Sequence, residues 1–125
     1  MNGQRTKHIL LIDDNMTDLR IIHQLLVHFG YHVTSTNDPY KALNFFREEP
    51  DKFLMIITDQ FMPGLKGHEL VTHVRQIRED IPVILCSGSE EALQELQYER
   101  KDIQRFLSKP ISRSELAEAI QDILA

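Results

Sequence analysis

Short apolar runs alternate along the chain with longer segments in which apolar residues recur at every third or fourth position. Apolar runs of roughly four to eight residues favour buried strands, and the longer period favours amphipathic helices. Because parallel sheets carry helices on both faces, a regular alternation of the two patterns predicts an α/β fold. The strands that we predict are His8–Asp13, His32–Thr36, Phe53–Thr58, Val83–Cys86 and Arg105–Leu107.

Residues that cap or stop helices separate these predicted strands. Helix starts are predicted at Asn15, at the pair Asp38-Pro39 and at Ser112, which forms an S-x-x-E capping box with Glu115. A fourth helix, after the fourth strand, is polar, and we expect it to be marginally stable. Helix ends are predicted at Gly30, near Glu49 and near Glu79.

The predicted strands differ in how apolar they are. Phe53–Thr58 is almost continuously apolar, which is typical of a strand that is buried on both faces at the centre of a sheet. His32–Thr36 is more polar and suits an edge. Asp59 therefore stands at the carboxyl end of the strand that we expect to be central.

Groups that can carry chemistry stand at the carboxyl ends of the strands. They are Asp13-Asp14, Asp59, Ser87 and Lys109-Pro110. Ligands of parallel sheets bind beyond these ends, so the groups should converge. Close carboxylates repel one another, and protonation or a hard cation such as Mg²⁺ relieves the repulsion. Taken alone, the first two aspartates fit a helix cap and Asp59 a turn, but their coincidence favours a joint site.

From Ile9 to Ile123 the sequence resembles the receiver domains of response regulators. The resemblance rests on DD at 13–14, D-x-x-M-P-G at 59–64, Gly67, S-G at 87–88 and K-P at 109–110, in this order. It implies a flavodoxin-like, doubly wound parallel sheet with strand order 2-1-3-4-5, within one receiver domain over residues 1–125. Two segments depart from the family pattern: Lys66 stands where an acidic residue is usual, and residues 99–102 replace a small, Gly-containing turn.

The resemblance implies that Asp59 is the phosphoacceptor of a phosphorelay. Asp14, Asp59 and the backbone carbonyl of Phe61 would bind Mg²⁺ directly, and Asp13 would bind it through a water, with Mn²⁺ able to substitute. A domain of this kind assists its own phosphorylation and dephosphorylation, and we expect no further enzymatic turnover.

Other groups would contact or sense the phosphoryl group. Ser87 and Lys109 would contact its oxygens, a role that fits the reaction because phosphoryl transfer is promoted by positioned cations and donors. The peptide bond before Pro110 would be cis. Ser87 and Phe106 would form a switch that acts on the face made by the fourth helix, fifth strand and fifth helix. For Phe106, simple packing in the core is an equally good reading.

Length and charge narrow the class of protein. A chain of 125 residues has room for one domain, and its net charge of −5 with a pI of about 5.6 argues against direct binding to nucleic acid or to a membrane surface. The segment Met1–Lys7 is polar, so we expect no signal peptide and a cytoplasmic protein. Cys86 is the single cysteine and is interpreted as a buried apolar residue.

The partners that the resemblance implies are a histidine kinase or a histidine phosphotransfer domain, with a homodimer through the same helix–strand–helix face as a further candidate.

Two alternative functions fit the sequence less well. A dehalogenase-like phosphatase would need a second acid in D-x-D, which Asp59-Gln60-Phe61 lacks. A flavodoxin-like cofactor binder would need a Gly-rich phosphate loop after the first strand, where two acids stand instead. Whether the chain acts alone or within a hybrid kinase stays open.

Overall fold

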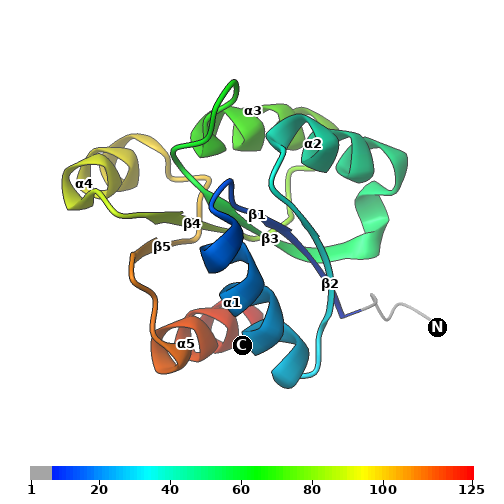
Figure 1. Cartoon of the computed structure of the whole chain (residues 1–125). Helices are drawn as coiled ribbons and strands as arrows, with labels where there is room; N and C mark the ends of the chain where they lie inside the picture. Colours follow the sequence, from blue (N-terminus) through cyan, green and yellow to red (C-terminus); the bar gives the residue numbers. More distant parts are fainter. Residues whose placement is uncertain (1–6) are drawn as a thin grey trace.

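Five strands form one parallel sheet in the order β2-β1-β3-β4-β5, which confirms the expected topology (Figure 1). The computed structural model describes residues 7–125. The absence of a signal peptide was predicted from Met1–Lys7, and residues 1–6 of that segment lie outside the described residues. Every strand begins at its predicted residue and ends within one residue of its predicted end. The strands are β1 (His8–Ile12), β2 (His32–Thr36), β3 (Phe53–Asp59), β4 (Val83–Ser87) and β5 (Arg105–Ser108).

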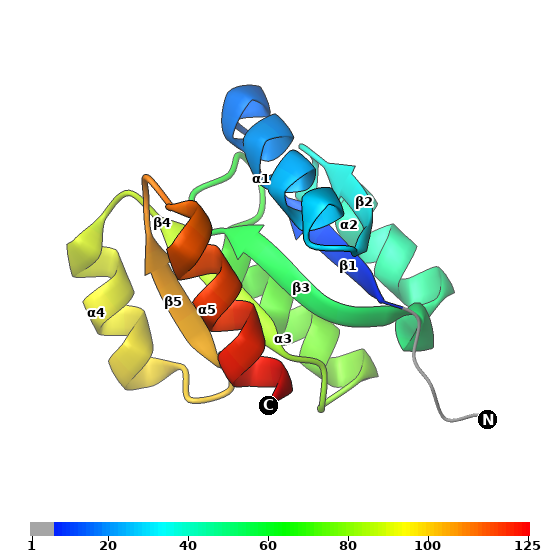
Figure 2. The ribbon, with the colours of Figure 1, turned by 90° about the horizontal axis from the view of Figure 1, so that it is seen from below.

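Helices cover both faces of the sheet. On one face lie α1 (Met16–His28) and α5 (Arg113–Leu124), and on the other lie α2 (Pro39–Glu48), α3 (Gly67–Ile77) and α4 (Glu90–Glu99) (Figures 1 and 2). Each face has its own apolar core. Leu26 and Leu116 pack in the first core, and Phe46, Val74 and Leu93 pack in the second.

The predicted caps are present at the helix starts. Asn15 accepts a hydrogen bond from the Asp18 backbone N–H at 3.0 Å, and Asp38 accepts one from Tyr40 at 2.9 Å. Ser112 and Glu115 form the reciprocal capping box, with distances of 3.1 and 3.3 Å. These bonds satisfy backbone donors that a helix leaves unpaired at its first turn, so they define where each helix begins.

Two local features differ from the predictions. Helix α3 ends at Ile77 rather than near Glu79 because the next residue, Arg78, adopts an extended backbone and its guanidinium turns inward. That guanidinium donates to the carbonyl oxygens of Pro50 at 2.9 Å and Phe53 at 2.7 Å. The short 3₁₀ helix η1 (Pro50–Lys52), which was not predicted, leads into β3.

Among the described residues, no helix combines the length and the apolarity that crossing a membrane requires.

Candidate functional site at the carboxyl edge of the sheet

The strand-end groups predicted from the sequence lie together in the structure. Asp13 directly follows β1, Asp59 ends β3, Ser87 ends β4 and Lys109 directly follows β5. Carboxylate oxygens of Asp13, Asp14 and Asp59 lie within 4.8 Å of one another, and we call these three residues the acidic cluster. Asp13 and Asp59 are buried and Asp14 is exposed, so the cluster opens to solvent on one side.

Lys109, directly after the edge strand β5, extends its side chain into this cluster. Its Nζ donates to Asp13 Oδ2 at 2.7 Å and forms an ion pair with Asp59 Oδ1 at 3.3 Å. The Lys109–Pro110 peptide bond is cis, the isomer that the resemblance led us to expect. The amine therefore lies beside the proposed acceptor carboxylate and compensates part of the cluster's negative charge.

The ionisation of Asp59 and Lys109 reflects this crowding. Burial, together with the charge of Asp13, raises the pKa of Asp59 to about 6, although the nearby Lys109 opposes the rise. Burial by itself would lower the pKa of Lys109, but its hydrogen bond and attraction to Asp13, with further help from Asp18 and Asp59, raise it on balance. The site therefore holds a permanent ammonium beside a carboxylate whose charge is costly, an arrangement that an added divalent cation would relieve.

Ser87 connects the cluster with the start of α4. Its side chain is fully buried, and its Oγ accepts a hydrogen bond from the Ser89 backbone N–H at 3.0 Å. Its carbonyl accepts one from the Lys109 backbone N–H at 2.8 Å. Ser89 in turn caps α4 through a 3.2 Å bond from Ala92. A movement of the Ser87 hydroxyl would therefore act first on the N-terminal turn of α4.

Phe106 lies on β5, beside α4. The ring is half-buried and packs against the core on the α2–α3–α4 face, so it is neither fully buried nor free in solvent. A hollow in front of it is lined by side chains of α4 and β5, namely Glu90, Leu93, Gln94, Gln97 and Ser108. The ring therefore borders open space on one side and the core on the other.

The loop between β3 and α3 closes tightly over the end of the central strand. Gly67 begins α3, and a Cβ atom there would lie 2.3 Å from the Asp59 carbonyl oxygen, so only glycine fits. The Gly67 N–H also donates to the Gln60 carbonyl at 2.9 Å. Phe61, two residues after Asp59, is 48% exposed, and its ring faces the Lys66 ammonium at 6.0 Å. The tight approach of Gly67 to Asp59 and Gln60 therefore fixes the path of the chain directly after the central strand.

Two features of this region were missed in the sequence. Asp18, on the first turn of α1, lies 3.1 Å from Lys109 Nζ. The available signal in the sequence was its position, about one helical turn after the Asp13-Asp14 pair. The other is a series of hydrogen bonds that runs from Gln60, the neighbour of Asp59, to the turn after α4. Gln60 binds His68, the His68 carbonyl accepts from Arg100 at 2.9 Å, and Arg100 forms two 2.9 Å bonds with Asp102.

The unusual turn at residues 99–102 thereby acquires a structural role. Arg100 and Asp102 close the turn after α4 through their side chains, where the family pattern has a small, Gly-containing turn. No single position signals this arrangement, because it depends on contacts between α3 and the turn. The acidic cluster is untouched by it.

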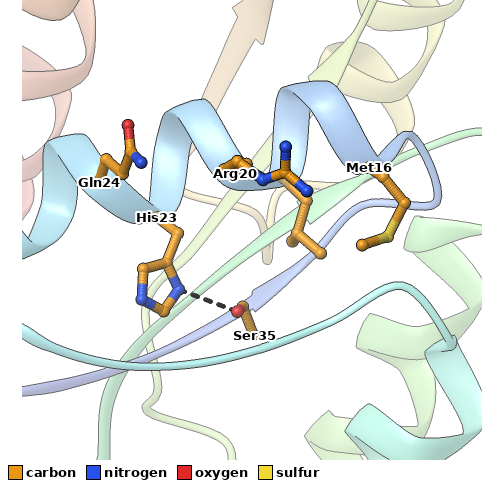
Figure 3. A pocket seen from close by; sticks show the side chains of 6 residues that line it. Met16, Arg20, His23, Gln24 and Ser35 are labelled. Atoms are coloured by element: carbon orange, nitrogen blue, oxygen red, sulfur yellow. Dashed lines mark hydrogen bonds between the residues drawn. The ribbon is translucent and has the colours of Figure 1, made fainter.

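A separate hollow lies between α1 and β2 (Figure 3). His23 of α1 meets Ser35 of β2 there, with Nδ1 and Oγ 2.9 Å apart. The remaining lining side chains are Met16, Leu19, Arg20 and Gln24.

Cys86 lies in the interior, on β4. Burial raises the pKa of its thiol to about 12, which keeps it protonated and agrees with its interpretation as a buried apolar residue.

Comparisons with known proteins agree with this geometry. The family model described as "Response regulator receiver domain" matches residues 9–121. A two-component response regulator of Arabidopsis thaliana is 34% identical over 116 residues, covering 93% of this chain but 19% of its own length. The chain thus spans about a fifth of the length of that curated relative.

Solved structures show the same fold. A response regulator receiver domain protein from Clostridium thermocellum superimposes with a TM-score of 0.86 at 27% identity, covering 94% of this chain and 93% of that one. The receiver domain of the hybrid histidine kinase CckA gives a TM-score of 0.80 at 28% identity, covering 94% and 99%. Topology, strand-end groups and sequence similarity therefore agree, and the chain belongs to the response regulator receiver domain family of two-component systems.

Proposed function

We propose that this receiver domain accepts a phosphoryl group on Asp59 in a Mg²⁺-dependent phosphorelay. The observation that carries the proposal is the position of the Asp59 carboxylate, which lies at the end of the central strand, within 4.8 Å of two further carboxylates and 3.3 Å from an ammonium. In the transfer, an Asp59 oxygen attacks phosphorus. The bond from phosphorus to the donor breaks, and the donor's leaving group takes the electron pair.

The residues around Asp59 fit the requirements of this reaction. Phosphoryl transfer depends on positioning and on positive charge near the transferred oxygens. Lys109 supplies a fixed ammonium, and Ser87 supplies a hydroxyl at the adjacent strand end. Both would contact phosphoryl oxygens once Asp59 is modified.

The acidic cluster fits a hard cation because its ligand atoms are all carboxylate oxygens. Asp14 and Asp59 would bind Mg²⁺ or Mn²⁺ directly together with the Phe61 carbonyl, and Asp13 through a water. When bound, the ion supplies positive charge that offsets both the repulsion within the cluster and the charge of the incoming phosphoryl group. Asp13 also holds Lys109 in place, since its Oδ2 is the closest acceptor to Nζ.

The phosphodonor would be a histidine kinase or a histidine phosphotransfer domain. Two exposed apolar side chains follow residues of the acidic cluster closely in the sequence: Met16, two residues after Asp14, is 51% exposed, and Phe61, two residues after Asp59, is 48% exposed. Apolar residues at the rim of a charged site are well placed to contact a protein surface. They support a protein donor that presents a phosphohistidine to Asp59.

The output surface would be the face formed by α4, β5 and α5. Phosphorylation would draw the Ser87 hydroxyl inward, weaken its bond to Ser89, and let Phe106 turn away from the hollow beside α4. Tyr98, at 82% exposure, adds an aromatic side chain to the exposed surface of α4. A downstream protein or a second copy of the domain would bind there. We further propose that residues 1–125 act as one unit in the cytoplasm, alone or as part of a longer regulator or hybrid kinase.

Transfer from a protein donor tests the proposed function. A phosphorylated histidine phosphotransfer domain is mixed with the receiver chain in Mg²⁺ or in EDTA, and label is followed on both proteins. We expect label to leave the donor and appear on the receiver only with Mg²⁺, and to be released by hydroxylamine, as an acyl phosphate is. Hydroxylamine-resistant label would contradict the assignment of a carboxylate acceptor.

A further inference from the structure

Lys109 contacts three carboxylates, and one of them lies outside the acidic cluster. Besides Asp13 and Asp59, its Nζ donates to Asp18 Oδ2 at 3.1 Å. Asp18 lies in the first turn of α1, and its side chain is 40% exposed, whereas that of Lys109 is 17% exposed. The ammonium therefore sits between the buried cluster and a third carboxylate at its edge.

The three partners of Lys109 differ in what the proposed reaction does to them. A lysine ammonium has three N–H donors, and here each has a carboxylate within reach. Phosphorylation converts Asp59 into an acyl phosphate, whose negative charge lies on the phosphoryl oxygens instead of the carboxylate, so the donor directed at Asp59 becomes available to a phosphoryl oxygen. Asp13 and Asp18 keep their charges and can hold the other two donors throughout.

Asp18 is well fixed for such a role. The Asn15 side chain caps the helix by accepting from the Asp18 backbone N–H at 3.0 Å, and the same helix buries Leu19, Ile22 and Leu26 in the core. Lys109, in contrast, carries its charge on a flexible four-carbon side chain in the segment between β5 and α5. A carboxylate on a packed helix therefore restricts where the ammonium can move.

We propose that Asp18 is a positioning residue for Lys109 in the phosphorylation of Asp59. It holds the ammonium from the α1 side, so that Nζ stays beside Asp59 before transfer and beside the phosphoryl oxygens after it. The proposal rests on the phosphoacceptor function of Asp59. It assigns Asp18 no contact with the phosphoryl group or with the metal.

A purely structural role for Asp18 is the alternative. An acidic side chain in the first turn stabilises a helix through the helix dipole, whatever it contacts. Glu115 provides the matched case, because it occupies the same third position of α5 and binds the Ser112 backbone N–H. Glu115→Gln removes the same charge from the same helix position without touching Lys109.

The test compares Asp18→Asn, Asp18→Glu and Glu115→Gln with the unchanged chain. Initial rates of Asp59 labelling by acetyl phosphate are measured at saturating Mg²⁺, with thermal midpoints and the NMR shift of the Lys109 Nζ. We expect Asp18→Asn to label roughly three- to tenfold more slowly, as suits the loss of one charged hydrogen bond at a partly exposed site. Asp18→Glu should recover part of the rate, and Glu115→Gln should label normally.

The two kinds of readout separate the possible failures. A displaced Lys109 Nζ resonance in Asp18→Asn, with an unchanged one in Glu115→Gln, would support the contact. If that resonance does not move, or if Asp18→Asn labels as fast as Glu115→Gln, the positioning role is wrong. If the unchanged chain takes up no phosphoryl group at all, the phosphoacceptor function fails instead, and the Lys109 resonance still reports whether the contact exists.

Discussion

Gln60 and His68 are joined by two hydrogen bonds directly beside the proposed acceptor. Gln60 Nε2 lies 2.6 Å from His68 Nδ1, and the His68 backbone N–H donates to Gln60 Oε1 at 2.9 Å. Gln60 is buried, so its amide depends on this partner. Burial lowers the pKa of His68, which favours the neutral ring that can accept from the amide.

Replacing both members of this pair should cost less stability than the two single replacements added together. His68→Leu or Gln60→Leu leaves a polar group without its partner, and each should lower the free energy of unfolding by about 1–3 kcal/mol. The double variant puts two apolar side chains in contact, so its loss should be clearly smaller than the sum of the single losses. Urea unfolding of the four proteins measures this coupling, and additive losses would mean that the two side chains do not depend on each other.

Mg²⁺ should stabilise the fold because it binds the acidic cluster of the native state and relieves its repulsion. Thermal midpoints should rise with Mg²⁺ concentration. Asp14→Ala should lose most of that rise, whereas Asp51→Ala, which removes an exposed aspartate from the opposite end of β3, should keep it. An undiminished response in Asp14→Ala would place the ion elsewhere.

The raised pKa of Asp59 predicts how stability changes with pH in the metal-free protein. Since the folded-state pKa of about 6 lies above the ordinary value of 3.8, the charged carboxylate destabilises the fold. The protonated carboxyl, in contrast, contributes to the stability of the fold. That contribution is fully present below pH 3.8 and is lost as the pH rises through 6.

Asp59→Asn, which carries no charge, should therefore be more stable than the unchanged chain in EDTA at pH 8, by roughly 1–3 kcal/mol. The difference should shrink towards pH 4 and on addition of Mg²⁺. Denaturant unfolding across this pH range measures it, and parallel curves for the two proteins would show that Asp59 is not strained by its surroundings.

The switch proposed for Phe106 predicts a change of environment upon phosphorylation. Beryllofluoride with Mg²⁺ mimics the acyl phosphate, and we expect the Phe106 ring resonances to shift as the ring leaves the hollow beside α4. Resonances of Phe46, a fully buried residue of α2, serve as the control and should move little. If Phe106 and Leu93 keep their shifts while Asp59 is fully occupied, the switch is wrong and the acceptor assignment stands.

The sequence predicted the sheet and the groups at its carboxyl edge well because both follow from local patterns. Phe53–Asp59 is apolar enough to require the centre of the sheet, and Asp13, Asp59 and Lys109 each stand beside a strand end. Parallel strands then bring these ends together without further information.

Side-chain contacts between distant segments were not predictable in the same way. The bond between Asp18 and Lys109 joins residues 91 positions apart, and the one between His68 and Arg100 joins residues 32 positions apart. The inward turn of Arg78, which ends α3 early, likewise depends on carbonyls of the segment before β3. Polar residues of this kind fit equally well on a solvated surface, so their partners become visible only in the fold.

The central claim is that Asp59 is the acceptor, and intact-mass measurement tests it most directly. The unchanged chain and Asp59→Asn are incubated side by side with acetyl phosphate and Mg²⁺. We predict that the unchanged chain gains the mass of one phosphoryl group and that Asp59→Asn gains none while remaining folded. A full gain of phosphoryl mass in Asp59→Asn would contradict the account.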